Sequence, residues 1–245
     1  MPCDGRSESV DERVANSNVD YMPLLAEDLL LLLLDDESGK PIVDGTRLPR
    51  VLAGAVLLEL ALAGTVTPDI DGSVVRKGRL VVRPDPAPDD PVLADATRRL
   101  ADAKPMKPAS AIEKLTKGLQ DTLIDRIVDR GWLREERGRI LGLFTTRRWP
   151  AVDESHERHV RAELRAALVD GLTPAPRTAA LVSMLSAVSA ASKVFPDADK
   201  RAVNKRAKEI AEGEWAGAAV RQAVEAVNTA MIAAVTAGAV AGSSG

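Results

Sequence analysis

The chain has 245 residues, enough to bury a core in one large domain or two small ones without disulfides or a structural metal. Aromatic residues make up 2% of the sequence while alanine and leucine are abundant, which favours close-packed helices over sheets. The formal net charge of -3 argues against a globally basic nucleic-acid-binding protein. We therefore expect a mainly α fold, a single-domain helical bundle.

The two ends of the chain differ in composition from the rest. Residues 1–20 are polar and resemble neither a secretory signal nor a membrane segment, so we expect a disordered leader, a folded domain over 21–240 and a flexible tail over 241–245. Cys3 lies in this leader without an intrachain partner, as is typical of a reducing compartment. The most hydrophobic run, Leu29–Leu34, is far shorter than the roughly 20 residues of a bilayer span. These features predict a cytoplasmic protein.

The first half of the sequence predicts helices that alternate with a small hairpin. A short helix over Leu24–Leu34 ends at a polar turn, and Pro49 is well placed as the first residue of a second helix that runs to about Ala63. Strand-like runs on either side of Asp69–Gly72 then predict a β-hairpin. After a proline-rich linker, a third helix is expected over Val92–Ala103.

The second half has a loosely similar layout. Apolar residues recur at helical spacing from Ile112 to Val128, Gly131 ends this helix, and a second hairpin follows with its polar turn at Glu135–Gly138. The remaining predicted helices are Asp153–Val169, Arg177–Val194, Lys200–Ala211 and Trp215–Ala237. Because Thr178–Val194 is apolar on nearly every side, we expect it to form the centre of the bundle with the alanine-rich last helix.

Catalytic and metal-binding motifs are weak or absent. The sequence has no serine elbow and no common phosphate-binding glycine loop. His156, His159 and Glu163 would share a helix face and could ligate zinc, but a solvated, charged first turn explains them better. Asp69 and Asp71 could begin a calcium loop, but the later ligands do not follow, so a plain turn is expected. We expect no cofactor, no metal and no enzymatic activity.

Basic residues form one candidate binding cluster. Arg47 and Arg50 lie near the start of one predicted helix, and Lys114 and Lys117 lie one turn apart on another. Together these four side chains could hold an anion. The alternative is an ordinary set of solvated surface charges, since an exposed pair of charges usually contributes little.

The second hairpin is another candidate, because it mixes cationic, aromatic and aliphatic side chains as a membrane-contacting surface does. Its residues of interest are Leu141, Leu143, Phe144, Arg147, Arg148 and Trp149. Ordinary core packing and solvated charge are the alternative interpretation. An apolar hairpin projecting from a compact domain also predicts self-association.

Several segments, in this order and spacing, resemble the Golgi phosphoprotein 3 family, which also has many bacterial members. They are Leu24–Leu32 (LLAEDLLLL), Gly54–Gly64 (GAVLLELALAG), Arg79–Val82 (RLVV), Val128–Leu133 (VDRGWL) and Leu143–Pro150 (LFTTRRWP). The resemblance spans roughly Leu24 to Ala237. It implies one helical domain with a hydrophobic central bundle, surrounding amphipathic helices and a protruding β-hairpin at about Ile140–Ala151.

The resemblance also implies a function. Eukaryotic members are peripheral membrane proteins that recognise phosphatidylinositol 4-phosphate and bind cytosolic tails of glycosyltransferases, and their hairpin is implicated in membrane contact and self-association. The family's headgroup-binding tryptophan falls on Asp44, and three arginines fall on Ala53, Lys117 and Gln120. Of these four positions only Lys117 is cationic, and Asp44 would repel a phosphate. The resemblance therefore predicts association with membranes, but without specific recognition of the phosphatidylinositol 4-phosphate headgroup.

The leading hypothesis is a non-enzymatic peripheral membrane or adaptor protein. Its expected partners are an anionic membrane surface, protein clients and a second copy of the chain. The candidate headgroup-binding residues are Lys117, Gln120, Arg47, Arg50 and Lys114. The alternative is a winged-helix-like nucleic-acid-binding or regulatory protein with Arg76, Lys77 and Arg79 on the wing near DNA phosphates, which the acidic net charge disfavours. An enzyme with an unfamiliar site is a third possibility.

Overall fold

A computed structural model of the chain describes residues 22–69, 71–140, 144–213, 225–233 and 236. In this part of the chain the protein is mainly helical and has two separate two-stranded antiparallel sheets, which confirms the predicted fold class. The predicted leader and tail lie outside the described residues. Within the described ranges, no helix combines the length and hydrophobicity needed to cross a bilayer.

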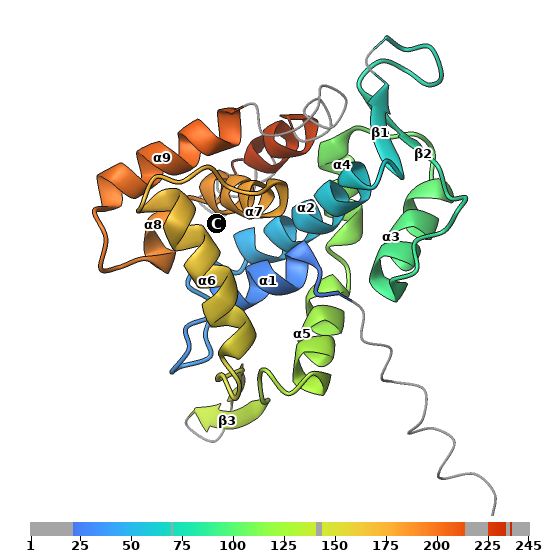
Figure 1. The fold of residues 1–245 in the computed structure, drawn as a ribbon. Helices are drawn as coiled ribbons and strands as arrows, with labels where there is room; N and C mark the ends of the chain where they lie inside the picture. The colour runs from blue at the N-terminus through green and yellow to red at the C-terminus, as the bar shows by residue number, and fades with distance from the viewer. Residues whose placement is uncertain (1–21, 70, 141–143, 214–224, 234–235, 237–245) are drawn as a thin grey trace, which may run out of the picture.

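Three helices, α1 (Leu25–Leu32), α2 (Arg47–Leu62) and α7 (Pro176–Ala187), lie at the centre of the fold (Figure 1). Every residue of α1 is buried, and eight consecutive residues of α7 are buried as well. The apolar character of α7 therefore predicted its place correctly. The leucine run of α1 likewise indicates burial, because apolar side chains on several faces of a helix have to be covered by other elements.

The last described helix, residues 225–233, packs on α2. Met231 is fully buried, and its Sδ lies only 2.5 Å from where a Cβ on Gly54 would stand. The absence of a side chain at Gly54 therefore lets Met231 approach the backbone of α2. The last helix was predicted to join the centre, and its described part does contact a central helix in this way.

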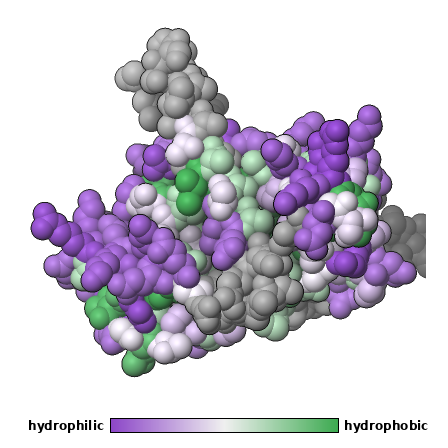
Figure 2. All heavy atoms as spheres, turned by 90° about the horizontal axis from the view of Figure 1, so that it is seen from above, coloured by the Kyte–Doolittle hydropathy of each residue, from purple (hydrophilic) through white to green (hydrophobic). Residues whose placement is uncertain are grey.

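The remaining helices surround this centre. They are α3 (Pro91–Ala101), α4 (Pro108–Leu115), α5 (Leu119–Asp129), α6 (Ser155–Leu168), α8 (Ala191–Val194) and α9 (Lys200–Glu212). These helices are amphipathic: α9, for example, buries Val203, Ala207 and Ile210 at helical spacing and exposes charged residues on its other side. Seen from above in Figure 2, hydrophilic residues cover most of the surface, with apolar residues in smaller areas between them.

The two sheets are both antiparallel hairpins, far apart in Figure 1. In the first, β1 (Val66–Asp69) pairs with β2 (Arg79–Val82). In the second, β3 (Glu136–Ile140) pairs with β4 (Phe144–Arg148), and Ile140 lies opposite Phe144. The second hairpin leaves the body of the protein below α5 and α6 in Figure 1, as the family resemblance implied.

The loop after β1 is organised by the Asp69 carboxylate. It accepts hydrogen bonds from the backbone amides of Gly72, Ser73, Val74 and Val75 at 2.6–3.2 Å. These bonds, that of the Val75 amide most of all, lower the pKa of Asp69. The oxygens that a calcium ion would need are thus used by the loop itself, which supports the plain turn expected from the sequence.

Two predicted helices are in fact broken. The apolar stripe from Ile112 to Val128 is divided between α4 and α5, because Gly118 has a φ of 75° and cannot continue a helix. The helix predicted over Arg177–Val194 breaks after Ala187, where Ser189 has a φ of 56°. In both cases the helical spacing of apolar residues continues across the break. The hydrophobic pattern alone therefore does not reveal the turn in the backbone.

Two smaller boundary predictions were also wrong. Helix α2 begins at Arg47, so Pro49 lies within its first turn, where a missing backbone N–H costs no helical hydrogen bond. Glu135–Gly138 was predicted as the turn of the second hairpin, but Glu136–Gly138 belongs to β3 and the connection falls at 141–143, outside the described residues. The polar residues indicated a turn because a strand that is exposed to solvent at these positions has the same polar composition as a turn.

The loop between α1 and α2 crosses the base of the second hairpin at Gly39. The Gly39 carbonyl accepts a hydrogen bond from the Trp149 amide at 3.1 Å, and Gly39 has a φ of 60°. A Cβ on this residue would stand 2.4 Å from the Trp149 nitrogen. Both the backbone conformation and the close approach therefore require glycine at this position.

We expect Gly39→Ala to lower the free energy of unfolding by about 2 kcal/mol, from left-handed strain and the clash with the hairpin backbone. Gly45→Ala is the matched control in the same loop, since nothing lies within 4 Å of the added Cβ and its φ is ordinary. Urea denaturation of the two variants measures the difference. Equal stability of the two would show that the crossing at Gly39 is unimportant.

Candidate functional site

The N-terminus of α2 carries one of the predicted cations, Arg47. This arginine is already paired with an acid of the preceding loop, Asp44. The Arg47 Nε atom lies 3.0 Å from Asp44 Oδ2. The Asp44 carboxylate also accepts hydrogen bonds from the amides of Thr46 and Arg47 and from the Thr46 hydroxyl. The hydroxyl bond contributes most to lowering the pKa of Asp44. An internal anion therefore fills the place where helix amides would otherwise attract an external one.

The second predicted arginine, Arg50, is also paired. Its Nε lies 2.6 Å from Glu113 Oε1, and Nη1 donates a hydrogen bond to the carbonyl of Thr46. This ion pair joins α2 to α4 and brings Arg50 next to the segment that carries Lys114. The side chains of Lys114 and Lys117 are exposed, and no carboxylate of the described residues lies within ion-pair distance of either. The two lysines are thus the cations of this cluster that remain available.

Arg99 of α3 holds the lysine segment in place from the side. Its guanidinium donates hydrogen bonds to the backbone carbonyls of both Lys114 and Lys117, at the C-terminal end of α4. A cation at this position also interacts favourably with the helix dipole. The sequence did not indicate Arg99, because a contact to the backbone of another helix has no sequence pattern. Arg99 therefore supports the candidate site without facing a ligand.

The other positions assigned by resemblance offer no charge. Ala53 is fully buried in α2, and Gln120 is partly buried in the first turn of α5. With Asp44 tied to the start of α2, Lys117 is left as the one exposed cation among these four positions.

The second hairpin is a neighbour of this cluster. Arg147 of β4 lies 3.9 Å from Asp121 in the first turn of α5 and 3.4 Å from Glu135. Because Asp121 follows Gln120 directly and Lys117 lies four residues before it, the base of the hairpin is close to the lysine segment. The Arg147–Asp121 contact therefore links the hairpin to the start of α5, the helix that follows the lysine segment.

The other predicted hairpin residues differ in their surroundings. Arg148 is exposed, whereas Trp149 is partly buried and packs against the hydrophobic core. Leu141 and Leu143 lie outside the described residues, and Phe144 is the first residue of β4. Among these described side chains, Arg148 is exposed without an ion pair, whereas Arg147 is paired with two acids and Trp149 faces the core.

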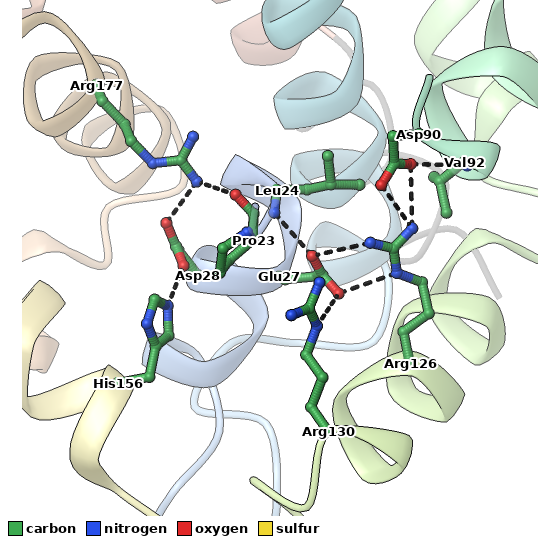
Figure 3. Close-up of polar contacts among 10 residues, drawn as sticks. All are labelled: Pro23, Leu24, Glu27, Asp28, Asp90, Val92, Arg126, Arg130, His156 and Arg177. Atoms are coloured by element: carbon green, nitrogen blue, oxygen red, sulfur yellow. Dashed lines mark hydrogen bonds and ion pairs between the residues drawn. The ribbon is translucent and has the colours of Figure 1, made fainter. Parts of the chain in front are cut away.

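A network of ion pairs with two buried acids, which the sequence did not reveal, surrounds α1 (Figure 3). Glu27 of α1 is fully buried. It lies 3.0 Å from Arg126 of α5 and 3.5 Å from Arg130, the residue that follows α5. Glu27 also accepts the amide of Leu24 at 2.7 Å, closing the start of α1. Arg126 reaches Asp90 as well, at 3.0 Å. These contacts attach α5 and the start of α3 to α1.

The adjacent acid, Asp28, points to the other side of α1 (Figure 3). Its exposed fraction is 2%, and it lies 2.7 Å from His156 Nε2 and 2.8 Å from Arg177 Nη2. Arg177 of α7 also donates to the carbonyl of Pro23 and reaches Glu59 at 3.4 Å. Asp28 thus links α1 to α6 and α7.

The zinc interpretation of the histidines fails on this geometry. His156 faces Asp28, whereas His159 is exposed and lies 3.4 Å from Glu163. No group of three potential metal ligands occurs within the described ranges. The expected solvated turn is also incomplete as a description, because His156 is partly buried and stacks on Trp132.

The first hairpin gives limited support to the winged-helix alternative. Arg76 and Lys77 are exposed in the loop between β1 and β2. Arg79, however, donates a hydrogen bond to the carbonyl of Pro105, and the Leu80 amide bonds to the Met106 carbonyl at 2.8 Å. One of the three proposed wing cations is therefore used to hold the linker before α4.

Comparison with known protein families gives a match. The family model described as Golgi phosphoprotein 3 (GPP34) matches residues 25–227, which includes all the helices and both hairpins described above up to the start of the last helix. No curated protein sequence matches the chain significantly.

Glu59 makes stability depend on pH in a predictable direction. Burial raises its pKa to about 7, even though Arg177 favours the charged form. Because the folded-state pKa lies above the ordinary value of 4.5, the folded protein binds the proton more tightly. This contribution to stability is full below pH 4.5 and is lost as the pH rises to 7; Glu157, with a pKa also raised to about 7 by burial, acts in the same direction.

We therefore expect a higher melting temperature at pH 5.5 than at pH 7.5, measured by circular dichroism in matched buffers. Glu59→Gln, which resembles the protonated form, should reduce this difference. Glu113→Gln is the control, because this glutamate is exposed and pairs with Arg50 at the surface. A melting temperature that rises with pH in the wild type, or an unchanged dependence in Glu59→Gln, would contradict the assignment.

Proposed function

Because the chain belongs to the Golgi phosphoprotein 3 family, we propose that it is a non-enzymatic peripheral membrane adaptor. It attaches to anionic lipid through the second hairpin and the neighbouring lysines of the α4 segment. The observation that carries this proposal is the hairpin itself, a cationic ribbon that projects from an acidic body. Family membership supplies the general role, and the local charges supply the mode of attachment.

The charge of the hairpin differs in sign from that of the rest of the chain. Residues 134–148 contain five arginines and two glutamates, a formal net charge of +3. The whole chain carries -3, so the remainder carries -6. The residues between the charged parts of the two strands are apolar, including Leu141, Leu143 and Phe144. Cations that flank an apolar tip match the chemistry of a lipid surface, where the tip enters the interface and the charges face headgroups.

Lys114 and Lys117 extend this surface. Both side chains are exposed and lack an acidic partner in the described part of the chain, while the nearby arginines are neutralised by Asp44 and Glu113. Each basic residue near an anionic membrane contributes about 1 kcal/mol of attraction. The unpaired lysines should therefore add to lipid affinity far more than the paired arginines do.

The proposed attachment depends on charge rather than on the identity of the headgroup. A phosphate monoester is best held by bidentate arginines, and the unpaired cations of the α4 segment are lysines, which act as point charges. Asp44 keeps a negative charge beside Arg47, at the start of α2. Phosphatidylinositol 4-phosphate should therefore offer no special advantage over other anionic lipids.

Charge reversal tests which surface meets the membrane. In low salt, we expect Lys114→Glu/Lys117→Glu to weaken co-sedimentation with phosphatidylserine vesicles at least about tenfold, because reversing two charges lowers the local net charge by four units. Lys205→Glu/Lys208→Glu on α9 is the matched control, since it changes the net charge equally at another exposed site. Equal losses would assign binding to total charge alone. Absence of binding by the wild type would overturn the proposal.

Lipid selectivity is tested with vesicles matched in total negative charge. One set contains phosphatidylserine and the other phosphatidylinositol 4-phosphate, and wild-type affinities should agree within about twofold, with a steep decrease as salt is added. A preference of tenfold or more for phosphatidylinositol 4-phosphate would show that the chain builds a specific site from other residues.

The apolar hairpin residues also predict self-association. The wild type should have a mass above that of the monomer in light scattering, and Leu143→Ser/Phe144→Ser should return it to the monomer by removing apolar contact area. Thr145→Ser in the same hairpin serves as a control that keeps its polarity. A monomeric wild type would refute this prediction.

A further inference from the structure

The root of the second hairpin is fastened by a ring stack. Trp132 lies between the end of α5 and the hairpin, and its indole stacks on the imidazole of His156, with centroids 4.3 Å apart and planes 8° apart. The Trp132 carbonyl accepts the Val152 amide at 2.8 Å, and Leu133 pairs with Ala151. Both stems of the hairpin are therefore closed beside the same stacked pair.

This stacked pair is held by the centre of the fold. His156 Nε2 lies 2.7 Å from Asp28 of α1, and Asp28 is held in turn by Arg177 of α7. The hairpin is covalently attached only to α5 and α6. His156 thus gives its root a connection to two central helices that the chain path does not provide (Figure 3).

A second contact reaches Trp132 from the neighbouring acid. Arg130 Cζ lies 5.2 Å from the centroid of the Trp132 ring, and Arg130 pairs with Glu27. The two adjacent acids of α1 are therefore both connected to Trp132 through one further side chain. Glu27 pairs with Arg130, which lies over the indole ring, and Asp28 contacts His156, which stacks on it.

We infer that Trp132, His156 and Asp28 form a clamp that fixes the direction in which the second hairpin projects. His156 is then a positioning residue for the membrane contact, a consequence that rests on the function proposed above. An isolated two-stranded ribbon has no further strand to brace it. If its direction is fixed, the apolar tip and the lysines can meet one surface together without a loss of conformational entropy on binding.

Distances between spin labels test the clamp without any membrane. In a Cys3→Ser background, labels at Arg137→Cys and Lys205→Cys report the position of the hairpin relative to α9, and labels at Arg98→Cys and Lys205→Cys report the body alone. All three sites are exposed. We expect His156→Ala to broaden the hairpin distance distribution at least about twofold and to leave the body distribution unchanged.

His159→Ala is the matched control, one turn along the same helix with an exposed side chain, and it should broaden neither distribution. His156→Phe keeps a ring against Trp132 but offers Asp28 no nitrogen, so it should give an intermediate width. An unchanged width in His156→Ala overturns the clamp. Broadening of both distributions also overturns it, because that result means general loosening of the protein.

Vesicle binding then separates the clamp from the proposed function. If both hold, His156→Ala should bind phosphatidylserine vesicles about threefold or more weakly than His159→Ala, with equal helical content in the two variants. If the wild type does not bind vesicles, the membrane proposal fails while the label distances still decide the clamp. Equal binding by the two variants would refute a role of His156 in positioning.

Discussion

Two neighbouring carboxylates on a completely buried helix, Glu27 and Asp28, impose the main constraint on this fold. An ionised carboxylate inside a protein is tolerated only when cations and hydrogen bonds replace its water. Each acid meets this requirement with partners from other helices, Glu27 from α5 and Asp28 from α6 and α7. The surrounding helices therefore have to stand where their cations can reach α1. Loss of every partner of one acid would leave an unpaired buried charge, which typically costs about 3–5 kcal/mol.

The extent to which the sequence predicts this arrangement depends on the range of the interaction. The leucine run of α1 and the apolar α7 indicate buried helices, because hydrophobic pattern is a local property. The partners of the acids could not be found in this way, since Arg126 and His156 lie 99 and 128 residues away from them along the chain. The helix breaks at Gly118 and Ser189 were missed for a different reason. A positive φ at each residue ends the helix, while the helical spacing of apolar residues continues past it.

The candidate site shows the same division. The presence of cations near α2 and α4, and of a mixed hairpin between α5 and α6, is evident from residue identity alone. Which cations are free is decided by tertiary contacts, above all the pairing of Arg50 with Glu113 across 63 residues. The closeness of the hairpin to the lysine segment depends similarly on Arg147 and Asp121. Sequence could thus nominate the residues but could not sort the available charges from the neutralised ones.

Charge therefore serves two separate purposes in this protein. Pairs with the buried acids of α1 hold the helices together, and salt screens them less than surface pairs because the carboxylates are buried. The cations of the second hairpin lie at the surface, where salt screens them, and they project from a body of opposite net charge. In the proposed attachment, an anionic membrane repels the body and attracts the hairpin, which orients the protein before any contact forms. A rigid root at Trp132 and His156 would preserve that orientation as the apolar tip reaches the lipid.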